Sequence, residues 1–579
     1  MGRIRKFVVE GYRSVCHPIE VNMPDRIPLV LIGENNAGKS NLVRALDLVL
    51  GEFWPGNYEP EDHEFYGRDR SSGLIKIEVS LNNVTDTSYG RNDQVNSLVW
   101  QVIPGDPDRF KMTYGAKSGT GRVNGLVRDQ CTCILVSADR RLSYQLGYSS
   151  KYTALSKLTK KFHDALSANA WRVDDLKNQY GKVVEVFHEV EEFVDFQDEL
   201  KRQIADLSGN LAYSLGIDFS PYDPSNYFRS LRVQPAEGGA PRTFEELGTG
   251  QEQVLAICFI YAYAKAFHNV DGLILMIEEP EAHLHPLAQH WLAEKIREIA
   301  AQGVQIVVTT HSPAFLDVLS LSGIVRVFKG QEGTETIQLT ARDLAKHCLA
   351  SGAEKTSEST VLPFYAAAAT EEILAGLFAR KVVLVEGPTE ALALPIYLAR
   401  VGLHPTREGI AFIPVGGVNS LPRWWRFFTA YEVPCYVIFD NDSESGKQRV
   451  GQEEVLRTIG LSEDDIGWLA DNDDWIADDA FCSFGVDFES TLRQWFDGSY
   501  EELEREASNN FGLDTRNSKP LRARFIAERL SLDNGSIGWG MLHELAQRIM
   551  HLGSSEETHS VVQQTVDEFD DEFDDVPFD

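Results

Sequence analysis

A glycine-rich segment near the start of the chain constrains the fold more than any other feature. Residues 33–40 read GENNAGKS, which fits the pattern G-x-x-x-x-G-K-S/T. The apolar run 28–32 predicts a strand before this segment, and the helical spacing of apolar residues over 42–50 predicts a helix after it. This order places backbone N–H groups, a lysine and a serine hydroxyl where phosphates and Mg²⁺ bind. The candidate phosphate-binding residues are Gly33, Asn35, Asn36, Gly38, Lys39 and Ser40.

Two further apolar runs end in residues suited to a nucleotide site. The run 273–277 predicts a strand followed by Glu278 and Glu279, and the run 304–308 predicts a strand followed shortly by His311. A carboxylate pair at a strand end beside a phosphate loop can hold the Mg²⁺ shell and orient water. We therefore assign Glu278 to the metal shell and Glu279 to water activation.

Together with the glycine-rich helix start at 247–252, these segments make residues 1–330 resemble an ABC-type ATPase head of the group that includes RecF and SMC proteins. The resemblance implies that 247–252 is the signature, which contacts the nucleotide of a second subunit. It also implies that 281–286 is the D-loop and that His311 is the switch histidine near the γ-phosphate. The signature departs from Leu-Ser-Gly-Gly-Gln/Glu, which predicts slow or gated ATP turnover. Its candidate nucleotide-binding residues are Gly248, Gly250 and Gln251.

Acidic side chains follow two apolar runs in the second half of the chain. The run 382–385 predicts a strand that ends in Glu386, and the run 435–439 predicts one that ends in an Asp-Asn-Asp segment. Open α/β sheets build their sites at the C-terminal ends of strands. Carboxylates bind hard cations, and two ions about 4 Å apart can clamp an in-line phosphodiester displacement. The candidate ligands are Glu386, which could instead shuttle a proton, Glu390, Asp440 and Asp442.

This ordered pair of strands resembles a Toprim domain, shared by topoisomerases, primases and certain nucleases. Asp487 and Glu489, expected to end another short strand, could complete a second metal site, and Lys519, expected just before a helix over 521–530, could offer a cation to the transition-state phosphate. A topoisomerase needs a nucleophilic tyrosine in a separate strand-passing domain, and a bacterial-type primase usually brings a zinc-binding domain. The sequence indicates neither, so nuclease chemistry is preferred.

Residues 1–550 resemble the OLD family (overcoming lysogenization defect), ABC-type ATPases with a C-terminal Toprim nuclease. That family also contains the nuclease subunit of the Gabija phage-defence system. The resemblance implies an ATP-regulated DNA endonuclease that uses ATP and Mg²⁺ or Mn²⁺, forms a homodimer or higher homo-oligomer, and acts against phage or mobile DNA. A RecF- or SMC-like ATPase that serves as a DNA-repair clamp or adaptor, without nuclease activity, stays open as the alternative.

Composition and charge exclude several other classes of protein. The net charge of −32 argues against a sequence-blind nucleic-acid coat, which needs a broad basic face. Seven dispersed cysteines without a Cys-x-x-Cys pair indicate neither a zinc ribbon nor a disulfide framework, and favour a reducing, cytoplasmic setting. The longest apolar run, 254–264, is too short to span a bilayer, and the first residues lack the apolar core of a signal peptide.

The fold class expected is α/β, with an ATPase head interrupted by a helical insertion and followed by a Toprim domain. The expected parts are 1–150 and 216–345 for the head, 151–215 for a helical dimerisation arm, 346–552 for the Toprim domain and 553–579 for a disordered acidic tail. Residues 330–360 read as a polar connector. Residues 567–579 resemble the acidic tip of single-stranded-DNA-binding proteins, although that tip ends in Phe and this segment continues to Asp579. The resemblance implies docking on proteins that read that tip, or competition with it. A tail that only aids solubility, or that screens the protein's own basic DNA path, stays open as the alternative.

Overall fold

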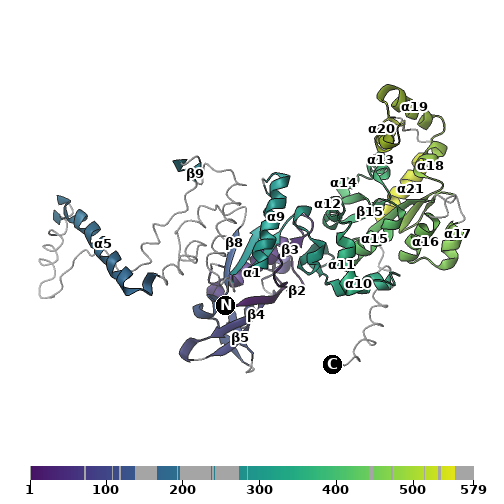
Figure 1. Cartoon of the computed structure of the whole chain (residues 1–579). Coiled ribbons are helices and arrows are strands. Elements are labelled where there is room, and N and C mark those ends of the chain that lie inside the picture. The colour runs from purple at the N-terminus through teal and green to yellow at the C-terminus, as the bar shows by residue number, and fades with distance from the viewer. Residues whose placement is uncertain are drawn as a thin grey trace.

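The computed structural model describes the parts of the chain that position both candidate sites (Figure 1). The described residues are 2–51, 53–70, 73–90, 92–106, 108–115, 119–136, 166–191, 194–195, 198, 236–237, 240–241, 273–282, 284–441, 448–470, 474–513, 515–532 and 536–553.

The N-terminal half is built on a six-stranded, largely parallel sheet. In spatial order its strands are β14 (Gly333–Gln338), β13 (Ile324–Gly330), β3 (Leu29–Ile32), β12 (Gln305–Thr309), β11 (Leu273–Glu278) and β8 (Thr132–Val136). β13 and β14 pair antiparallel, and all other neighbours pair parallel. β3, β11 and β12 are buried along their whole length, as expected for a parallel sheet covered on both faces. Their C-terminal ends therefore meet at one edge.

A second, antiparallel sheet packs against the first with a helix between them. In spatial order its strands are β2 (Ile19–Asn22), β1 (Arg3–Glu10), β4 (Ile75–Asp86), β5 (Asp93–Val102), β6 (Phe110–Tyr114) and β7 (Thr120–Arg122). The helix is α1 (Lys39–Leu50), whose Leu42 and Leu46 share one core with Phe7 of β1 and Val307 of β12. This packing fixes the glycine-rich loop that precedes α1.

The C-terminal half contains a five-stranded sheet. In spatial order its strands are β16 (Ile410–Pro414), β15 (Lys381–Val385), β17 (Cys435–Asp440), β19 (Phe481–Phe484) and β18 (Ile476–Ala477), of which only the β18–β19 pair is antiparallel. One face packs against α13 (Pro388–Arg400), α20 (Lys519–Arg529) and α21 (Ile537–His551). The other face packs against α15 (Leu421–Ala430). Further helices are α14 (Pro405–Glu408), α16 (Gln448–Thr458), α17 (Glu463–Ala470), α18 (Phe488–Trp495) and α19 (Ser499–Phe511).

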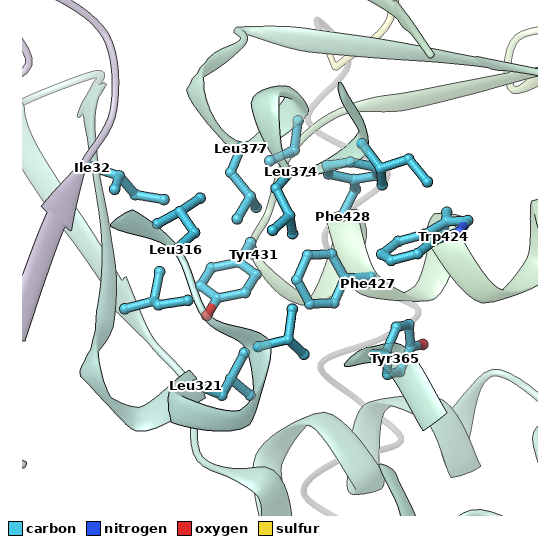
Figure 2. Packing of buried hydrophobic residues seen from close by; sticks show 14 of the residues in the cluster. Ile32, Leu316, Leu321, Tyr365, Leu374, Leu377, Trp424, Phe427, Phe428 and Tyr431 are labelled. Carbon is cyan, nitrogen blue, oxygen red and sulfur yellow. The ribbon is translucent and has the colours of Figure 1, made fainter. Parts of the chain in front are cut away.

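One hydrophobic core joins the two halves (Figure 2). Ile32 at the end of β3, together with Leu316 and Leu321, lies in the same cluster as Phe427 and Tyr431 of α15 and the turn after it. Phe427 and Tyr431 are fully buried, and their ring centroids lie 5.6 Å apart. Burial of aromatic rings on this scale is a main source of stability, so the halves form one packed body.

The polar segment 330–360, expected as a connector, is instead regular structure. It contains β14, α10 (Ala341–Ala350) and the first part of α11 (Glu358–Ala366). Leu344 and Cys348 of α10 are buried in the shared core, while Arg342 and Asp343 are exposed, so the helix is amphipathic. Polarity alone predicted a connector because the helical period of these few apolar residues was not recognised.

The structure tests the predicted strands, describes part of the expected helical insertion and does not describe the expected tail. The strands predicted over 28–32, 273–277, 304–308, 382–385 and 435–439 are confirmed, and so is the α/β class. Within the expected helical insertion the structure describes α5 (Ala170–His188), which lies apart from the sheets (Figure 1). The tail 567–579 lies outside the described residues.

Two sequence-based exclusions can be compared with the described residues. Their six cysteines are all free. No single helix among them is long and apolar enough to cross a bilayer, although the bent pair Glu358–Ala366 and Glu371–Phe378 reaches the required length and composition when taken together.

Candidate functional site

The glycine-rich loop between β3 and α1 has the backbone conformation of a phosphate cradle. Gly33, Asn36 and Gly38 have φ values of 138°, 65° and 114°, all in the left-handed region that glycine adopts most easily. A Cβ on Gly33 would lie 1.9 Å from the carbonyl oxygen of Val327 in β13, so glycine is required there. The loop therefore packs closely on β13 and turns directly into the N-terminus of α1.

Lys39, the first residue of α1, is hydrogen-bonded to the backbone of this loop. Its Nζ donates to the carbonyl oxygens of Gly33 at 2.9 Å and Glu34 at 2.8 Å. The side chain is buried, and burial lowers the pKa of Lys39 to about 8, although Glu279, Glu281 and Glu34 act to raise it. An ammonium held this way is available to exchange two carbonyl partners for phosphate oxygens.

The predicted metal-shell, water-orienting and switch residues are at or just after the ends of β12, which lies next to β3, and β11, which lies next to β12. Glu278 ends β11, and Glu279 follows it with a φ of 47°, a strained value for a non-glycine residue. The N–H of Glu279 donates to the carbonyl oxygen of Thr309, at the end of β12. His311 follows β12, with its Nε2 3.9 Å from Oε1 of Glu279, and burial lowers the pKa of His311. The sheet order thus brings the predicted ATP-site residues to one edge.

Glu281 is a residue that the sequence did not single out within the 281–286 segment. Its Oε1 accepts a hydrogen bond from the backbone N–H of His311 at 2.6 Å. Burial raises the pKa of Glu281, and the backbone hydrogen bond from His311 opposes this rise. This hydrogen bond therefore connects the predicted D-loop with the predicted switch histidine. The two residues are 30 positions apart, so no short sequence motif predicts the contact.

A second group of polar residues lies at the C-terminal ends of β15 and β17. Glu386 follows β15, and its Oε1 accepts from the N–H of Asp440 at 2.9 Å. The carbonyl oxygen of Glu386 accepts from the N–H groups of Gly416 and Gly417, whose φ values are 84° and 116°. The left-handed turn after β16 thus holds the backbone of Glu386 in place.

Carboxylates near Glu386 repel one another in a buried setting. Asp440 is held by the N–H of Phe488, which donates to its Oδ1 at 2.9 Å, while Oε2 of Glu390 accepts from the N–H of Gly387 at 3.0 Å. Burial raises the pKa of Glu390 to about 7, with a further contribution from Glu489 and Glu386. Burial also raises the pKa of Asp440 far above its usual value, and Glu390, Glu386, Glu489 and Asp487 add to the rise.

Asp487 and Glu489 do not end a strand, contrary to the sequence prediction. β19 ends at Phe484, and Asp487 caps α18 by accepting from the N–H of Ser490 at 2.7 Å. Glu489 lies in the first turn of α18, because the capping aspartate starts a helix where a strand end was expected. The turn after β19 still brings both carboxylates next to Asp440.

Lys519 is the first residue of α20, so the helix begins two residues earlier than predicted. Its Nζ lies 2.9 Å from Oε2 of Glu489, whose side chain is 7% exposed. The other oxygen of Glu489, Oε1, is buried and has no hydrogen-bond partner among the described residues. This oxygen is therefore an acceptor that the described protein groups leave unsatisfied.

The chemistry of this cluster fits a hard divalent cation. The raised pKa values of Asp440 and Glu390 and the unsatisfied oxygen of Glu489 suit binding of Mg²⁺ or Mn²⁺. Within the described ranges, however, no three His, Cys, Asp or Glu side chains already gather at metal-binding distance. The donors are close neighbours, and side-chain adjustment is needed to form a complete ligand set.

Four of the predicted site residues cannot be placed in this geometry. They lie outside the described residues and are Gly248, Gly250, Gln251 and Asp442.

Charged side chains also connect the two sites across the shared core. Nε of Arg380, directly before β15, donates to both carboxylate oxygens of Glu34 in the glycine-rich loop, at 2.9 and 2.8 Å. Arg326 of β13 donates to the carbonyl oxygens of Tyr431 at 3.0 Å and Glu432 at 3.2 Å, after α15. The loop that holds Lys39 is thus bonded to the strand that leads to Glu386.

Comparisons with known families match both halves. Residues 77–316 match the family described as AAA ATPase domain. Residues 377–442 match the family described as the TOPRIM domain of overcoming lysogenization defect protein-like proteins.

Several individual proteins are also similar to this chain in sequence. The chain is 24% identical over 468 residues to the OLD nuclease of Thermus scotoductus, which covers 78% of this chain and 84% of the relative. It is 24% identical over 223 residues to the Old nuclease of Escherichia phage P2, covering 38% and 36% of the two chains. It is 20% identical over 486 residues to the Endonuclease GajA of Bacillus cereus, covering 78% and 77%. Among solved structures, an Smc head domain from Pyrococcus furiosus bound to the C-terminal domain of ScpA has a TM-score of 0.34 at 16% identity, over 58% of this chain and 96% of that one.

Proposed function

We propose that the chain is an OLD-family ATPase and nuclease, with an AAA ATPase domain followed by an OLD-like TOPRIM domain, and that it acts as an ATP-regulated, divalent-metal-dependent DNA endonuclease. One observation carries the proposal. Carboxylates from the ends of β15 and β17 and from α13 and α18 gather next to Lys519, and burial together with these neighbours raises the pKa of Asp440 and Glu390, which suits metal-assisted phosphodiester hydrolysis.

In the proposed reaction, Asp440, Glu390, Asp487 and Glu489 would hold the cations, together with Asp442. Bound Mg²⁺ or Mn²⁺ supplies charge that stabilises the attacking and leaving oxygens. Glu386, oriented by the N–H of Asp440, takes the proton of the attacking water. The oxygen of water would bond to phosphorus as the bond to the leaving sugar oxygen breaks, that oxygen would take a proton from solvent, and Lys519 would compensate the charge that develops on the phosphate.

The proposed ATP site uses the residues around the glycine-rich loop. Gly33, Asn35, Asn36 and Gly38 offer backbone N–H groups, Lys39 binds the β- and γ-phosphates, and Ser40 and Glu278 hold the Mg²⁺ shell. Glu279 orients water, and His311 lies where it senses the γ-phosphate. In an assembled dimer, Gly248, Gly250 and Gln251 would close the site of the second subunit.

Control of cleavage by ATP is part of the proposal. Phosphate oxygens that bind Lys39 displace the carbonyl groups of Gly33 and Glu34, and Glu34 is paired with Arg380 before β15. A ligand shifts an equilibrium only through contacts that differ between two states, and this exchange of partners supplies such a difference.

Plasmid cleavage tests the proposed function directly. Wild-type protein is expected to nick or cut DNA with Mg²⁺ or Mn²⁺, and ATP is expected to change the rate. Glu386→Ala and Asp440→Ala should abolish cleavage, while Lys39→Ala should remove only the response to ATP. The matched control is Glu502→Gln, an exposed carboxylate of α19. Wild-type protein that cuts no DNA with either metal would refute the proposal.

A second function is favoured by one observation. Because no three acidic, histidine or cysteine side chains among the described residues gather at metal-binding distance, an ATPase that acts as a DNA-repair clamp or adaptor is the competing proposal. It predicts nucleotide-dependent DNA binding without cleavage under any metal.

The setting and partners extend the proposal. We expect a cytoplasmic homodimer or higher homo-oligomer, with 151–215 as the dimerisation arm, acting against phage or mobile DNA. The proposed parts are the head (1–150 and 216–345), the Toprim domain (346–552) and the acidic tail (553–579).

Deleting 567–579 should reduce recovery of proteins that read the acidic tip of single-stranded-DNA-binding proteins, and unchanged recovery would refute docking by the tail. Plaque counts with wild-type protein and Asp440→Ala test the defence role.

A further inference from the structure

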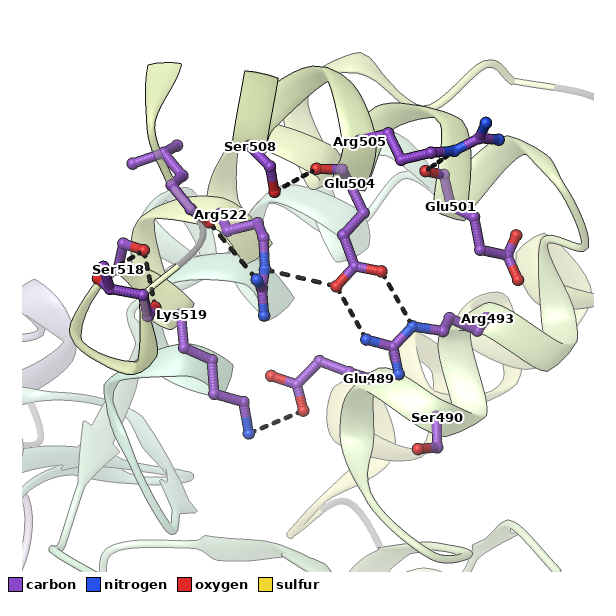
Figure 3. A network of polar contacts seen from close by, with 12 residues as sticks. Glu489, Ser490, Arg493, Glu501, Glu504, Arg505, Ser508, Ser518, Lys519 and Arg522 are labelled. Atoms are coloured by element: carbon purple, nitrogen blue, oxygen red, sulfur yellow. Dashed lines mark hydrogen bonds and ion pairs between the residues drawn. The ribbon is translucent and has the colours of Figure 1, made fainter. Parts of the chain in front are cut away.

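Three helices beside the proposed nuclease site meet at one carboxylate (Figure 3). Glu504 of α19 accepts from Nη2 of Arg493 at 2.8 Å through Oε1 and from Nε of Arg493 at 3.1 Å through Oε2. Nε of Arg522 lies 3.5 Å from Oε1 of the same carboxylate. Glu504 is 20% exposed, and the hydrogen bond from Arg493 lowers its pKa, so it remains ionised. Two-pronged arginine–carboxylate contacts fix distance and direction at once.

Each of the two arginines lies one helical turn from a member of the Glu489–Lys519 ion pair. Arg493 follows Glu489 by four residues on α18, and Arg522 follows Lys519 by three residues on α20. Residues at these spacings share one face of a helix. Glu504 therefore ties α18 to α20 beside the point where Lys519 contacts Glu489.

The orientation of Glu489 depends on this spacing of helices. Its Oε2 lies 2.9 Å from Nζ of Lys519, while its buried Oε1 has no hydrogen-bond partner among the described residues. If α20 moves away from α18, Lys519 no longer fixes which oxygen is presented to the other carboxylates.

From this geometry we infer that Glu504 is a positioning residue of the nuclease site, which holds Lys519 on one oxygen of Glu489 and leaves the other oxygen for a divalent cation. The inference rests on the proposed function of the site. Glu504 acts through Arg493 and Arg522 and touches neither metal nor DNA.

Loss of the Glu504 charge has a specific consequence at Glu489. Without it, the guanidinium of Arg493 loses its carboxylate partner one turn from Glu489 and competes with the cation for Oε1. Groups that orient metal-binding side chains typically affect metal affinity or activity by 10–100-fold. Glu504→Gln should therefore weaken Mn²⁺ binding about tenfold and lower kcat for DNA cleavage by about the same factor.

The experiment compares Glu504→Gln, Glu504→Asp and Glu502→Gln in the full chain. Calorimetric titration with Mn²⁺ alone measures metal affinity without relying on cleavage. Plasmid cleavage gives kcat, KM for DNA and the Mn²⁺ concentration at half activity. ATP hydrolysis and thermal unfolding report whether the fold is intact. We expect Glu504→Gln to lose Mn²⁺ affinity and kcat at unchanged KM, Glu504→Asp to recover part of both, and Glu502→Gln to behave as wild type.

Three results would overturn the inference and leave the proposed function standing. The first is wild-type Mn²⁺ affinity and kcat in Glu504→Gln. The second is a raised KM at unchanged kcat, which would place Glu504 in DNA binding. The third is a joint loss of ATP hydrolysis and thermal stability, which would make its role purely structural. A wild-type protein that binds Mn²⁺ but cuts no DNA would overturn both proposals.

Discussion

At each of the two sites, burial disfavours the charged form of one residue. Lys39 keeps its ammonium with two carbonyl oxygens as hydrogen-bond partners, and Asp440 is buried among four acidic neighbours. Such charges are costly unless a counter-charge arrives, which links the titration and the stability of these residues to ligand binding.

Nucleotide affinity should fall as pH rises through the pKa of Lys39. Burial lowers that pKa to about 8, and the protonated ammonium is the form that binds phosphate. Raising the pH from about 7 to about 9 should weaken binding of a fluorescent ATP analogue about tenfold, because most of the lysine is then neutral. Lys39→Ala should bind weakly with no pH dependence over this range. A wild-type affinity that stays constant across the range would contradict the prediction.

Replacing Asp440 with Asn should stabilise the metal-free protein. The amide keeps the acceptor for the N–H of Phe488 and removes a carboxyl group that must either stay charged against four acidic neighbours or take up a proton on folding. We expect the free energy of unfolding at neutral pH to rise by about 1–2 kcal/mol, and cleavage to be lost. Thermal unfolding with EDTA measures the gain. An unfolding temperature below that of the wild type would show that the repulsion is not the dominant effect.

At the scale of elements, short motifs and distant contacts differ in what the sequence reveals. The loop with Lys39 and the strand before Glu386 are local patterns, so both were predicted. Glu489 was expected after a strand and lies on a helix, because the capping role of Asp487 was missed. Glu281, Arg380 and Glu504 had no local signal, since their partners lie 30, 346 and 11 residues away along the chain.

The glycine-rich loop gives a prediction at this scale. Gly33→Ala places a Cβ 1.9 Å from the carbonyl oxygen of Val327, in a backbone conformation with φ of 138°. We expect a loss of about 1–3 kcal/mol in unfolding free energy together with loss of ATP binding, because the loop must leave β13. Gly67→Ala is the control: its φ is 67° and nothing lies within 4 Å of the added Cβ, so strain of about 1 kcal/mol should leave ATP binding intact. Equal behaviour of the two variants would refute the packing argument.

At the scale of the whole molecule, the two sites are linked through a packed core and a few polar contacts. Ile32 directly precedes the glycine-rich loop and shares a core with Tyr431 and Phe427. The Glu34–Arg380 ion pair lies at the same junction. Such a junction transmits a shift in one half as a movement of the other, because packed interiors deform little.

The Glu34–Arg380 pair should set part of the response of cleavage to nucleotide. Glu34→Gln and Arg380→Gln are each expected to reduce, by about two- to fivefold, the factor by which a non-hydrolysable ATP analogue changes the cleavage rate, since partly exposed ion pairs contribute about 0–1 kcal/mol. The double variant should do no more than either single change, and the exchange Glu34→Arg with Arg380→Glu should restore the response. Arg407→Gln, at an exposed arginine of α14, is the control. Additive effects of the two single changes would exclude direct coupling.

The aromatic residues around Tyr431 also bear on how proteins of this architecture can be taken apart or recombined. Cutting the chain between the two sheets would expose Phe427, Phe428 and Tyr431 on one fragment and Leu316 and Leu321 on the other. Each fragment would then present to water an apolar surface that is buried in the whole chain. A chimera that takes its nuclease half from a relative therefore also needs the matching apolar residues of that relative at the positions of Leu316 and Leu321.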